Sequence, residues 1–256
     1  MRDILYLSRP AEVSMADRWF QIAASDHFWI RRRFDVFRSL AGRMIGGASD
    51  LAEIGCGHGL LQHQIEEAYG REIKGFDLNE IALKQSLATR SDVCCYDICQ
   101  RNPEFKSKFD MIFLFDVLEH IEDEDMFLQA VLFHLAPAGK LVINVPAGQW
   151  IYSVYDEAAG HKRRYSIRTM RNSVGRSGLG VTKWTYWGFP LLPALMLRKL
   201  WLMGKHDQDK IISEGFDSRS PFINNFLGAT SRCELIPQKL IGTSLMAVVE
   251  RNQIAI

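Results

Sequence analysis

The stretch Glu53-Ile54-Gly55-Cys56-Gly57-His58-Gly59 decides the fold, because it has the character of a turn between a buried strand and a helix. A short apolar run at 50–54 leads into it, and apolar residues recur at helical spacing over 60–69. Glycines here let the backbone bend sharply and let a ligand approach the main chain. The helix behind them offers unpaired N–H groups. The turn therefore predicts a nucleotide-type ligand rather than a purely structural bend.

The alternative for this turn is the dinucleotide fingerprint G-x-G-x-x-G, which places a pyrophosphate on the helix N-terminus. Leu60 occupies the place of the third glycine, which comes one residue early as Gly59. Glu53 would repel a phosphate but attract a ligand that carries positive charge. Both departures count against a nicotinamide-dependent oxidoreductase and favour a cationic cofactor.

Outward from the turn, strands and helices alternate along the chain. The pattern predicts strands over 50–54, 72–76, 93–96, 111–115 and 141–145, and helices over 60–69, 79–89 and 123–135. This alternation is typical of an α/β fold with a parallel sheet and helices on both faces. Ligands of such sheets lie beyond the carboxyl ends of the strands. Asp77 could accept from both ribose hydroxyls there, and Asp97 from an adenine amino group.

The composition excludes several classes of protein. The chain has 256 residues, a net charge of +1 and 47% hydrophobic residues, so it is neither intrinsically disordered nor a dedicated nucleic-acid binder. No window approaches the roughly 18 apolar residues that a transmembrane helix needs. The N-terminus lacks the features of a signal peptide. Five cysteines, an odd number, favour reduced thiols and a cytoplasmic protein.

Three runs of sequence resemble the motifs of class I S-adenosylmethionine-dependent methyltransferases. They are LAEIGCGHG at 51–59, FDMIFLFDVLEHI at 109–121 and LAPAGKLVINVP at 135–146. Two more, HFWIRRR at 27–33 and GHKRRY at 160–165, resemble a narrower subgroup that acts on small-molecule, sugar or lipid acceptors. The resemblance implies a Rossmann-like fold whose seven-stranded sheet is mostly parallel, with an antiparallel last strand and helices on both faces.

The same resemblance implies an S-adenosylmethionine site. Its expected residues are Arg31, Arg33, Glu53, Gly55, Cys56, Gly57, Asp77, Leu78, Asp97, Ile98, Phe115 and Asp116. The acids Glu53 and Asp116 suit the sulfonium and ammonium of this cofactor. Arg31 or Arg33 could supply the cation that its carboxylate needs. His58 departs from the family pattern, in which a small or hydroxyl residue is frequent.

Catalysis by such a protein would be an in-line displacement, with a base to remove a proton from a hydroxyl or protonated amine acceptor. His161 is the first candidate for the base, followed by Tyr165 and His120. No N/D-P-P-Y sequence is present, which favours an oxygen atom of a small-molecule, sugar or lipid-like acceptor. No metal is expected, because no His/Cys cluster has ligand spacing along the chain.

The chain divides into three regions of one domain in this interpretation. Residues 1–49 form an N-terminal helical cap, 50–145 hold the cofactor, and 146–256 supply acceptor-side loops and helices and the C-terminal strands. The uncharged stretch 184–197 could be a core helix, an apolar lid over the acceptor or an interfacial membrane contact. A cofactor-binding scaffold without catalysis stays open as an alternative to the enzyme.

Overall fold

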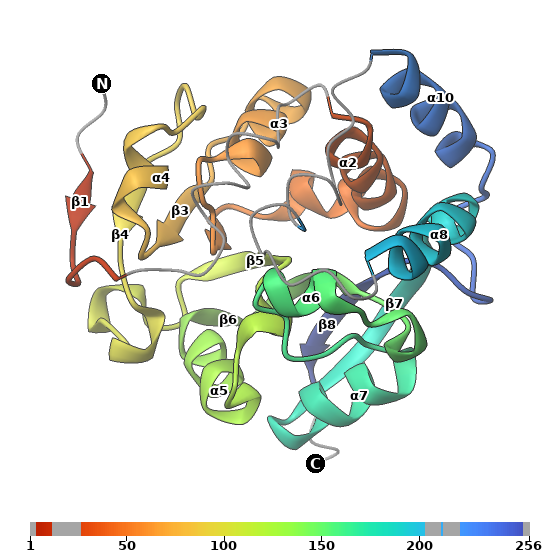
Figure 1. The fold of residues 1–256 in the computed structure, drawn as a ribbon. Helices are drawn as coiled ribbons and strands as arrows, with labels where there is room; N and C mark the ends of the chain where they lie inside the picture. The colour runs from red at the N-terminus through yellow and green to blue at the C-terminus, as the bar shows by residue number, and fades with distance from the viewer. Residues whose placement is uncertain (1–3, 12–26, 203–210, 212–220, 253–256) are drawn as a thin grey trace.

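An eight-stranded sheet runs through the molecule in the order β1-β4-β3-β2-β5-β6-β8-β7 (Figure 1). The computed structural model describes residues 4–11, 27–202, 211 and 221–252. The strands are β1 (Leu5–Tyr6), β2 (Leu51–Ile54), β3 (Lys74–Asp77), β4 (Val93–Cys95), β5 (Phe109–Phe115), β6 (Leu135–Pro146), β7 (Leu179–Trp187) and β8 (Ser244–Arg251). All pairings are parallel except those of β8, which runs antiparallel to β6 and β7. The predicted class of fold, including the antiparallel last strand, is confirmed.

Helices cover both faces of this sheet. The described α-helices are α2 (Phe28–Leu40), α3 (Leu60–Tyr69), α4 (Glu80–Lys84), α5 (Glu124–His134), α6 (Val154–Ala158), α7 (Ile167–Arg176), α8 (Leu192–Leu202) and α10 (Pro221–Arg232). Helices α2 and α3 lie on one face and α5 and α7 on the other (Figure 1). None of the described helices is both long and apolar enough to cross a membrane.

The alternation of side chains along β5 explains the two layers. Met111, Phe113 and Phe115 pack with α2 and α3, whereas Ile112 and Leu114 pack with α5 and α7. A strand sends successive side chains to opposite faces, so a continuous apolar run is what a doubly covered strand requires.

Several element boundaries differ from the sequence expectation. Helix α3 and its C-terminal Gly70 lie where they were predicted, with Gly70 in the left-handed conformation that ends the helix. Helix α4 is shorter than the predicted 79–89, and β6 begins earlier than 141. Helix α2 begins after His27, whose side chain accepts from the Trp29 amide.

The N-terminal region is not simply a helical cap, which corrects the assignment of 1–49. Leu5 and Tyr6 form β1, which pairs in parallel with β4 and makes the sheet eight-stranded rather than seven-stranded. Both side chains are exposed, so the strand carries none of the apolar alternation by which sequence analysis finds strands. Its backbone pairing covers what would otherwise be the edge at β4.

Candidate active site

A cavity of about 1020 Å³ opens beyond the carboxyl ends of the parallel strands. Its volume lies at the upper end of the roughly 300–1,000 Å³ that ligand pockets occupy. One part of its wall follows β2, β3, β4 and β5 and carries most of the predicted cofactor residues. These are Arg33, Glu53, Gly55, Cys56, Gly57, Asp77, Leu78, Asp97, Ile98, Phe115 and Asp116.

The glycine turn between β2 and α3 brings the backbone itself to the cavity. Gly55 and Gly57 have φ of 75° and 54°, a region that side chains disfavour. A Cβ on Gly55 would overlap the side chain of Val117. The amide of Gly57 donates to Asp77 Oδ2 over 2.7 Å, which ties the turn to the end of β3. Two neighbouring strand ends therefore act as one wall.

Glu53 gives this wall a buried acid with one unpartnered oxygen. Its carboxyl is buried, and Oε2 has no hydrogen-bond partner within the protein. Burial raises the pKa of Glu53 well above its usual range, against the opposing effect of Arg33. An orphaned buried carboxyl is costly unless a cationic or donating ligand meets it. The sulfonium and ammonium of S-adenosylmethionine fit this requirement.

Asp116 lies in a more crowded environment than the sequence suggested. Arg33 Nη1 donates to its Oδ2 over 2.5 Å, and Asn144 Nδ2 donates to its Oδ1 over 2.8 Å. Burial raises the pKa of Asp116, while Arg33 works against the rise. Asp116 also has φ of 59°, a strained conformation for a side-chain-bearing residue that is typical of functional sites. The aromatic rings of Trp29 and Phe115 flank the Arg33 guanidinium.

Arg31 is a predicted cofactor residue that lies away from the cavity. It lies on the exposed side of α2 and does not line the cavity, whereas Arg33 does. Asp97 lines the cavity but also caps a short turn, because its Oδ1 accepts from the Cys99 amide over 2.9 Å. Of the two predicted arginines, Arg33 is thus the one at the cavity, where it is already paired with Asp116.

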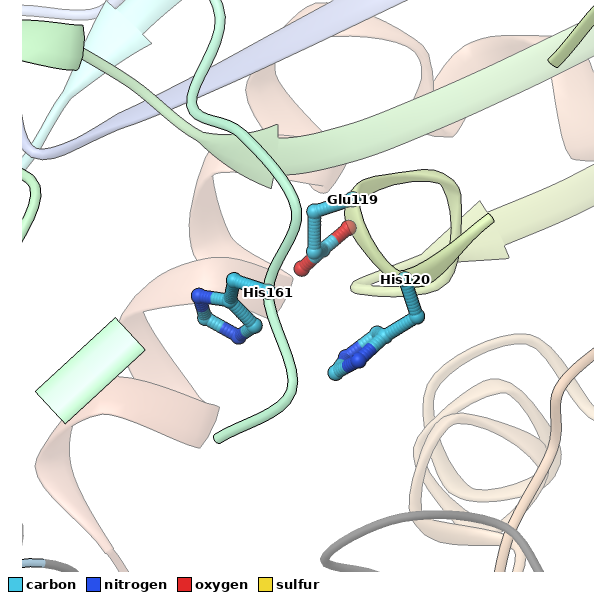
Figure 2. A group of neighbouring side chains, drawn as sticks. All are labelled: Glu119, His120 and His161. Carbon is cyan, nitrogen blue, oxygen red and sulfur yellow. The ribbon is translucent and has the colours of Figure 1, made fainter. Parts of the chain in front are cut away.

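A second group of polar residues faces the cofactor wall. Glu119, His120 and His161 converge on one point of the cavity, the first two from the turn after β5 and the third from the loop after α6 (Figure 2). The rings of His120 and His161 are 4.9 Å apart. Burial lowers the pKa of His120 to about 4, helped by nearby His161, so its imidazole is neutral near pH 7.

His161 is held in place by Asp156, a residue that sequence reasoning missed. Its Nδ1 lies 2.9 Å from Asp156 Oδ1, and Arg164 Nε donates to the same oxygen over 2.8 Å. Although burial opposes the change, these partners lower the pKa of Asp156. Asp156 belongs to the capping box of α6 with Ser153, and that Ser-x-x-Asp spacing could have placed it at a helix start. Nothing in the sequence could have paired it with His161.

Tyr165 does not belong to the site, which corrects its candidacy as a base. The side chain is buried outside the cavity lining, and its hydroxyl donates to Glu124 Oε1 and to the carbonyl of Leu118. Burial and the hydrogen bond to Glu124 raise its pKa far above that of an ordinary tyrosine. Tyr165 therefore fastens the loop after β6 to the turn after β5.

The rest of the wall is apolar and comes from the helices around the opening. It includes Phe28 and Trp29 of α2, Tyr155 and Ala159, Leu195, Leu197 and Trp201 of α8, and Leu227 of α10. Of the three interpretations of 184–197, the core helix is wrong. Within α8 only Leu192 and Leu202 are buried, and Leu197 and Leu200 are 68% and 63% exposed. The stretch ends in a helix that lines the cavity on one side and meets solvent on the other.

Comparison with known proteins finds methyltransferases, which agrees with the geometry of the cavity. Residues 26–190 match a family described as a methyltransferase domain. A probable S-adenosylmethionine-dependent methyltransferase of Mycolicibacterium smegmatis is 28% identical over 125 residues, which are 48% of this chain and 47% of that protein. A ubiquinone biosynthesis O-methyltransferase of Idiomarina loihiensis is 27% identical over 111 residues, 40% of this chain and 45% of that protein. The chain thus spans about half the length of the curated relatives it matches.

Comparison with solved structures also finds methyltransferases. The crystal structure of an S-adenosylmethionine-dependent methyltransferase from Archaeoglobus fulgidus superimposes with a TM-score of 0.53, covering 86% of this chain and 94% of that one at 18% identity. At that identity the likeness shows the fold, which is Rossmann-like. The family match covers the glycine turn, the acidic strand ends and the loop of His161. It also runs against the nicotinamide-dependent alternative and confirms, at the level of the family, the predicted cofactor. This chain belongs to the methyltransferase-domain family.

Proposed function

We propose that this protein transfers the methyl group of S-adenosylmethionine to a hydroxyl oxygen of a small amphipathic acceptor. The bound cofactor supplies an activated methyl group on a sulfonium. The protein then has to hold the cofactor, exclude water and activate the acceptor. The cavity wall with Glu53, Asp77 and Arg33 supports the first task, and the apolar helices support the second.

The observation that carries the proposal is the pair of His161 and buried Asp156. Asp156 holds Nδ1 of His161, so that Nε2 is left for the cavity. Asp116 and His161 both line the cavity. A hydroxyl placed between them would lie beside the cofactor's reactive end and beside a nitrogen lone pair that can activate it. The O-methyltransferase of Idiomarina loihiensis supports oxygen as the attacked atom.

The apolar part of the wall supports an acceptor with a ring or chain. Leu195, Leu197 and Trp201 line the cavity from α8, and the guanidinium of Arg198 lies 3.8 Å from the centroid of the Tyr155 ring. This combination of apolar faces with polar tips is typical of sites for amphipathic molecules. Exposed Leu200 extends the apolar face beyond the opening. An acceptor with a chain long enough to meet this face would reach the site from a micelle or a membrane surface.

The test is methyl transfer to matched acceptors that share one apolar body and carry a hydroxyl, an amine or a thiol. We expect mass spectrometry to find the methyl group on the hydroxyl compound. His161→Ala should lower turnover tenfold or more, with the affinity for S-adenosylhomocysteine within about threefold of the parent protein. Tyr165→Phe should leave turnover nearly unchanged.

Two results would contradict this proposal. Methylation of only the amine compound would refute oxygen as the attacked atom. Tight cofactor binding without turnover on any acceptor would instead favour the cofactor-binding scaffold.

A further inference from the structure

Glu119, His120 and His161 have the geometry of a metal site. Each offers one ligand atom, and these atoms all lie within 4.8 Å of one another (Figure 2). Linear spacing along the chain predicted no metal, but the fold joins an adjacent Glu-His pair to a histidine from a distant loop. The spacing along the chain is therefore no argument against a metal site here, because the third residue comes from a distant segment.

The ligand atoms are available, which distinguishes this group from an ordinary polar cluster. Glu119 Oε2 and His120 Nδ1 are buried and have no hydrogen-bond partner within the protein. Glu119 itself is almost completely buried, at 1% exposure. Two buried polar atoms without a partner, on neighbouring residues of this group, have a free-energy cost that a bound ligand would remove.

His161 completes the group with a nitrogen whose orientation is fixed. Asp156 Oδ1 lies 2.9 Å from its Nδ1, and Arg164 Nε donates to the same oxygen, so Nε2 is the ring nitrogen left for a ligand. A carboxylate behind a histidine is the usual arrangement at protein metal sites, where it fixes the tautomer and makes the imidazole a better ligand.

We propose that Glu119, His120 and His161 bind one divalent first-row transition metal ion at the acceptor end of the cavity. Two imidazoles with one carboxylate suit Zn²⁺ or Fe²⁺, whereas Mg²⁺ and Ca²⁺ prefer oxygen ligands alone. Zn²⁺ should bind more tightly than Mn²⁺. Three protein ligands leave at least one position open for the acceptor.

The role of this ion rests on the proposed O-methylation. An acceptor hydroxyl bound at the open position would lose its proton to water more readily, because the cation stabilises the resulting oxygen anion. The oxygen lone pair then forms the C–O bond while the S–C bond breaks and its electrons stay on sulfur. The products are the methyl ether, S-adenosylhomocysteine and one proton. His161 acts here as a ligand rather than as a direct base, so Glu119 and His120 become equally necessary.

The experiment uses untagged full-length protein, stripped with a chelator, and measures metal binding without any acceptor. Zn²⁺ is titrated by calorimetry, and Co²⁺ is followed by its visible absorption, which reports the ligand set. We expect one equivalent of metal in the parent protein. Each of Glu119→Gln, His120→Ala and His161→Ala should weaken Zn²⁺ binding a hundredfold or more, and Asp156→Asn about 10–100-fold. His63→Ala removes a histidine outside the cavity and should bind metal normally.

Binding of S-adenosylhomocysteine by every variant shows that the fold survives. Failure of the parent protein to bind Zn²⁺ at micromolar concentration would overturn the metal site, as would undiminished binding by His120→Ala. Turnover adds a separate readout, because a direct base at His161 would leave His120→Ala active, whereas the metal site requires loss of activity in all three ligand variants. One equivalent of bound metal without any transfer to oxygen would support the site and refute the proposed function.

Discussion

At the scale of the residue, two buried glutamates, Glu53 and Glu119, line the cavity of this protein. Both have an oxygen without a hydrogen-bond partner, and burial raises the pKa of both. Their neighbours differ, because Glu53 lies by the glycine turn and Arg33, while Glu119 lies by two imidazoles. The first therefore suits an organic cation and the second a metal ion.

Glu53→Gln should weaken the binding of S-adenosylmethionine more than the binding of its product, S-adenosylhomocysteine. S-adenosylmethionine carries a sulfonium charge that S-adenosylhomocysteine lacks, so loss of the carboxylate should weaken the former by about tenfold or more, which is about 1.4 kcal/mol. Binding of the cation favours ionised Glu53, whose pKa is raised in the free protein. Affinity for S-adenosylmethionine should accordingly increase with pH across that raised pKa in the parent protein and stay flat in the variant.

Calorimetry with both ligands over a series of pH values checks this prediction. The glutamine variant keeps the size of the side chain, so the glycine turn should remain intact. An equal loss of affinity for the two ligands would show that Glu53 acts through the shape of the turn and not through its charge.

At the scale of the element, one glutamate near the end of α3 binds residues 89–91, the segment that precedes β4. Glu66 is buried and accepts from the amide and hydroxyl of Thr89 and from the amides of Arg90 and Ser91, over 2.6 to 3.0 Å. Burial works to raise the pKa of Glu66, but the hydrogen bonds from Ser91 and Thr89 outweigh it and lower the pKa to about 2. The segment before β4 therefore depends on one charged acceptor.

Glu66→Gln should lower the free energy of unfolding by about 1.5–3 kcal/mol near pH 7, because hydrogen bonds to a charged acceptor are lost. The folded pKa lies below the ordinary value of 4.5, so this contribution is complete above pH 4.5 and is lost as the pH falls toward 2. The difference between parent and variant should therefore shrink across that window.

Urea denaturation at several pH values measures this difference. Glu67→Gln, on the exposed side of the same helix, is the matched control and should change the stability little. A constant difference between pH 7 and pH 2.5 would mean that Glu66 acts through packing alone.

At the scale of the whole molecule, the sheet and the surrounding helices form different parts of the cavity wall. The strand ends carry the polar groups, while α2, α6, α8 and α10 supply the apolar part of the wall and the opening (Figure 1). Helix α10 packs against α2, and the Phe28 amide donates to Asn224 Oδ1 over 2.8 Å. Segments from both ends of the chain therefore shape the acceptor region.

Leu197→Ser should change the use of long apolar acceptors. Leu197 lines the cavity and is 68% exposed, so it can contact a chain that extends out of the opening. We expect KM for a long-chain hydroxyl acceptor to rise severalfold, since burying the leucine contributes about 1.5–3 kcal/mol at most. The kcat, and KM for a short-chain acceptor, should change little.

Steady-state kinetics with the two acceptors tests this expectation. Leu240→Ser is the control, because Leu240 is 88% exposed but does not line the cavity. The same rise in KM for both acceptors would contradict the prediction, because it would mean that Leu197 orients the reacting group and does not contact the long chain.

The sequence by itself determined the class of the fold and the cofactor wall. Strand ends of a parallel sheet meet at one edge, so Asp77, Asp97 and Asp116 could be placed together from their positions after apolar runs. The glycines at 55 and 57 marked the turn for the same local reason, since few other residues tolerate that backbone. These features depend on short-range patterns, which a sequence displays directly.

Only the tertiary structure decided the acceptor side. Arg31 and Arg33 were equivalent in sequence, but residues two apart on a helix point in different directions, and the packing of α2 turned Arg33 inward. Tyr165 and His161 lie in one loop, yet the hydrogen bond to Glu124 draws Tyr165 into the core while Asp156 keeps His161 at the cavity. Glu119 and His120 meet His161 only because the turn after β5 and the loop after α6 pack together. Contacts between distant segments depend on how the whole chain packs, and that information is absent from local sequence.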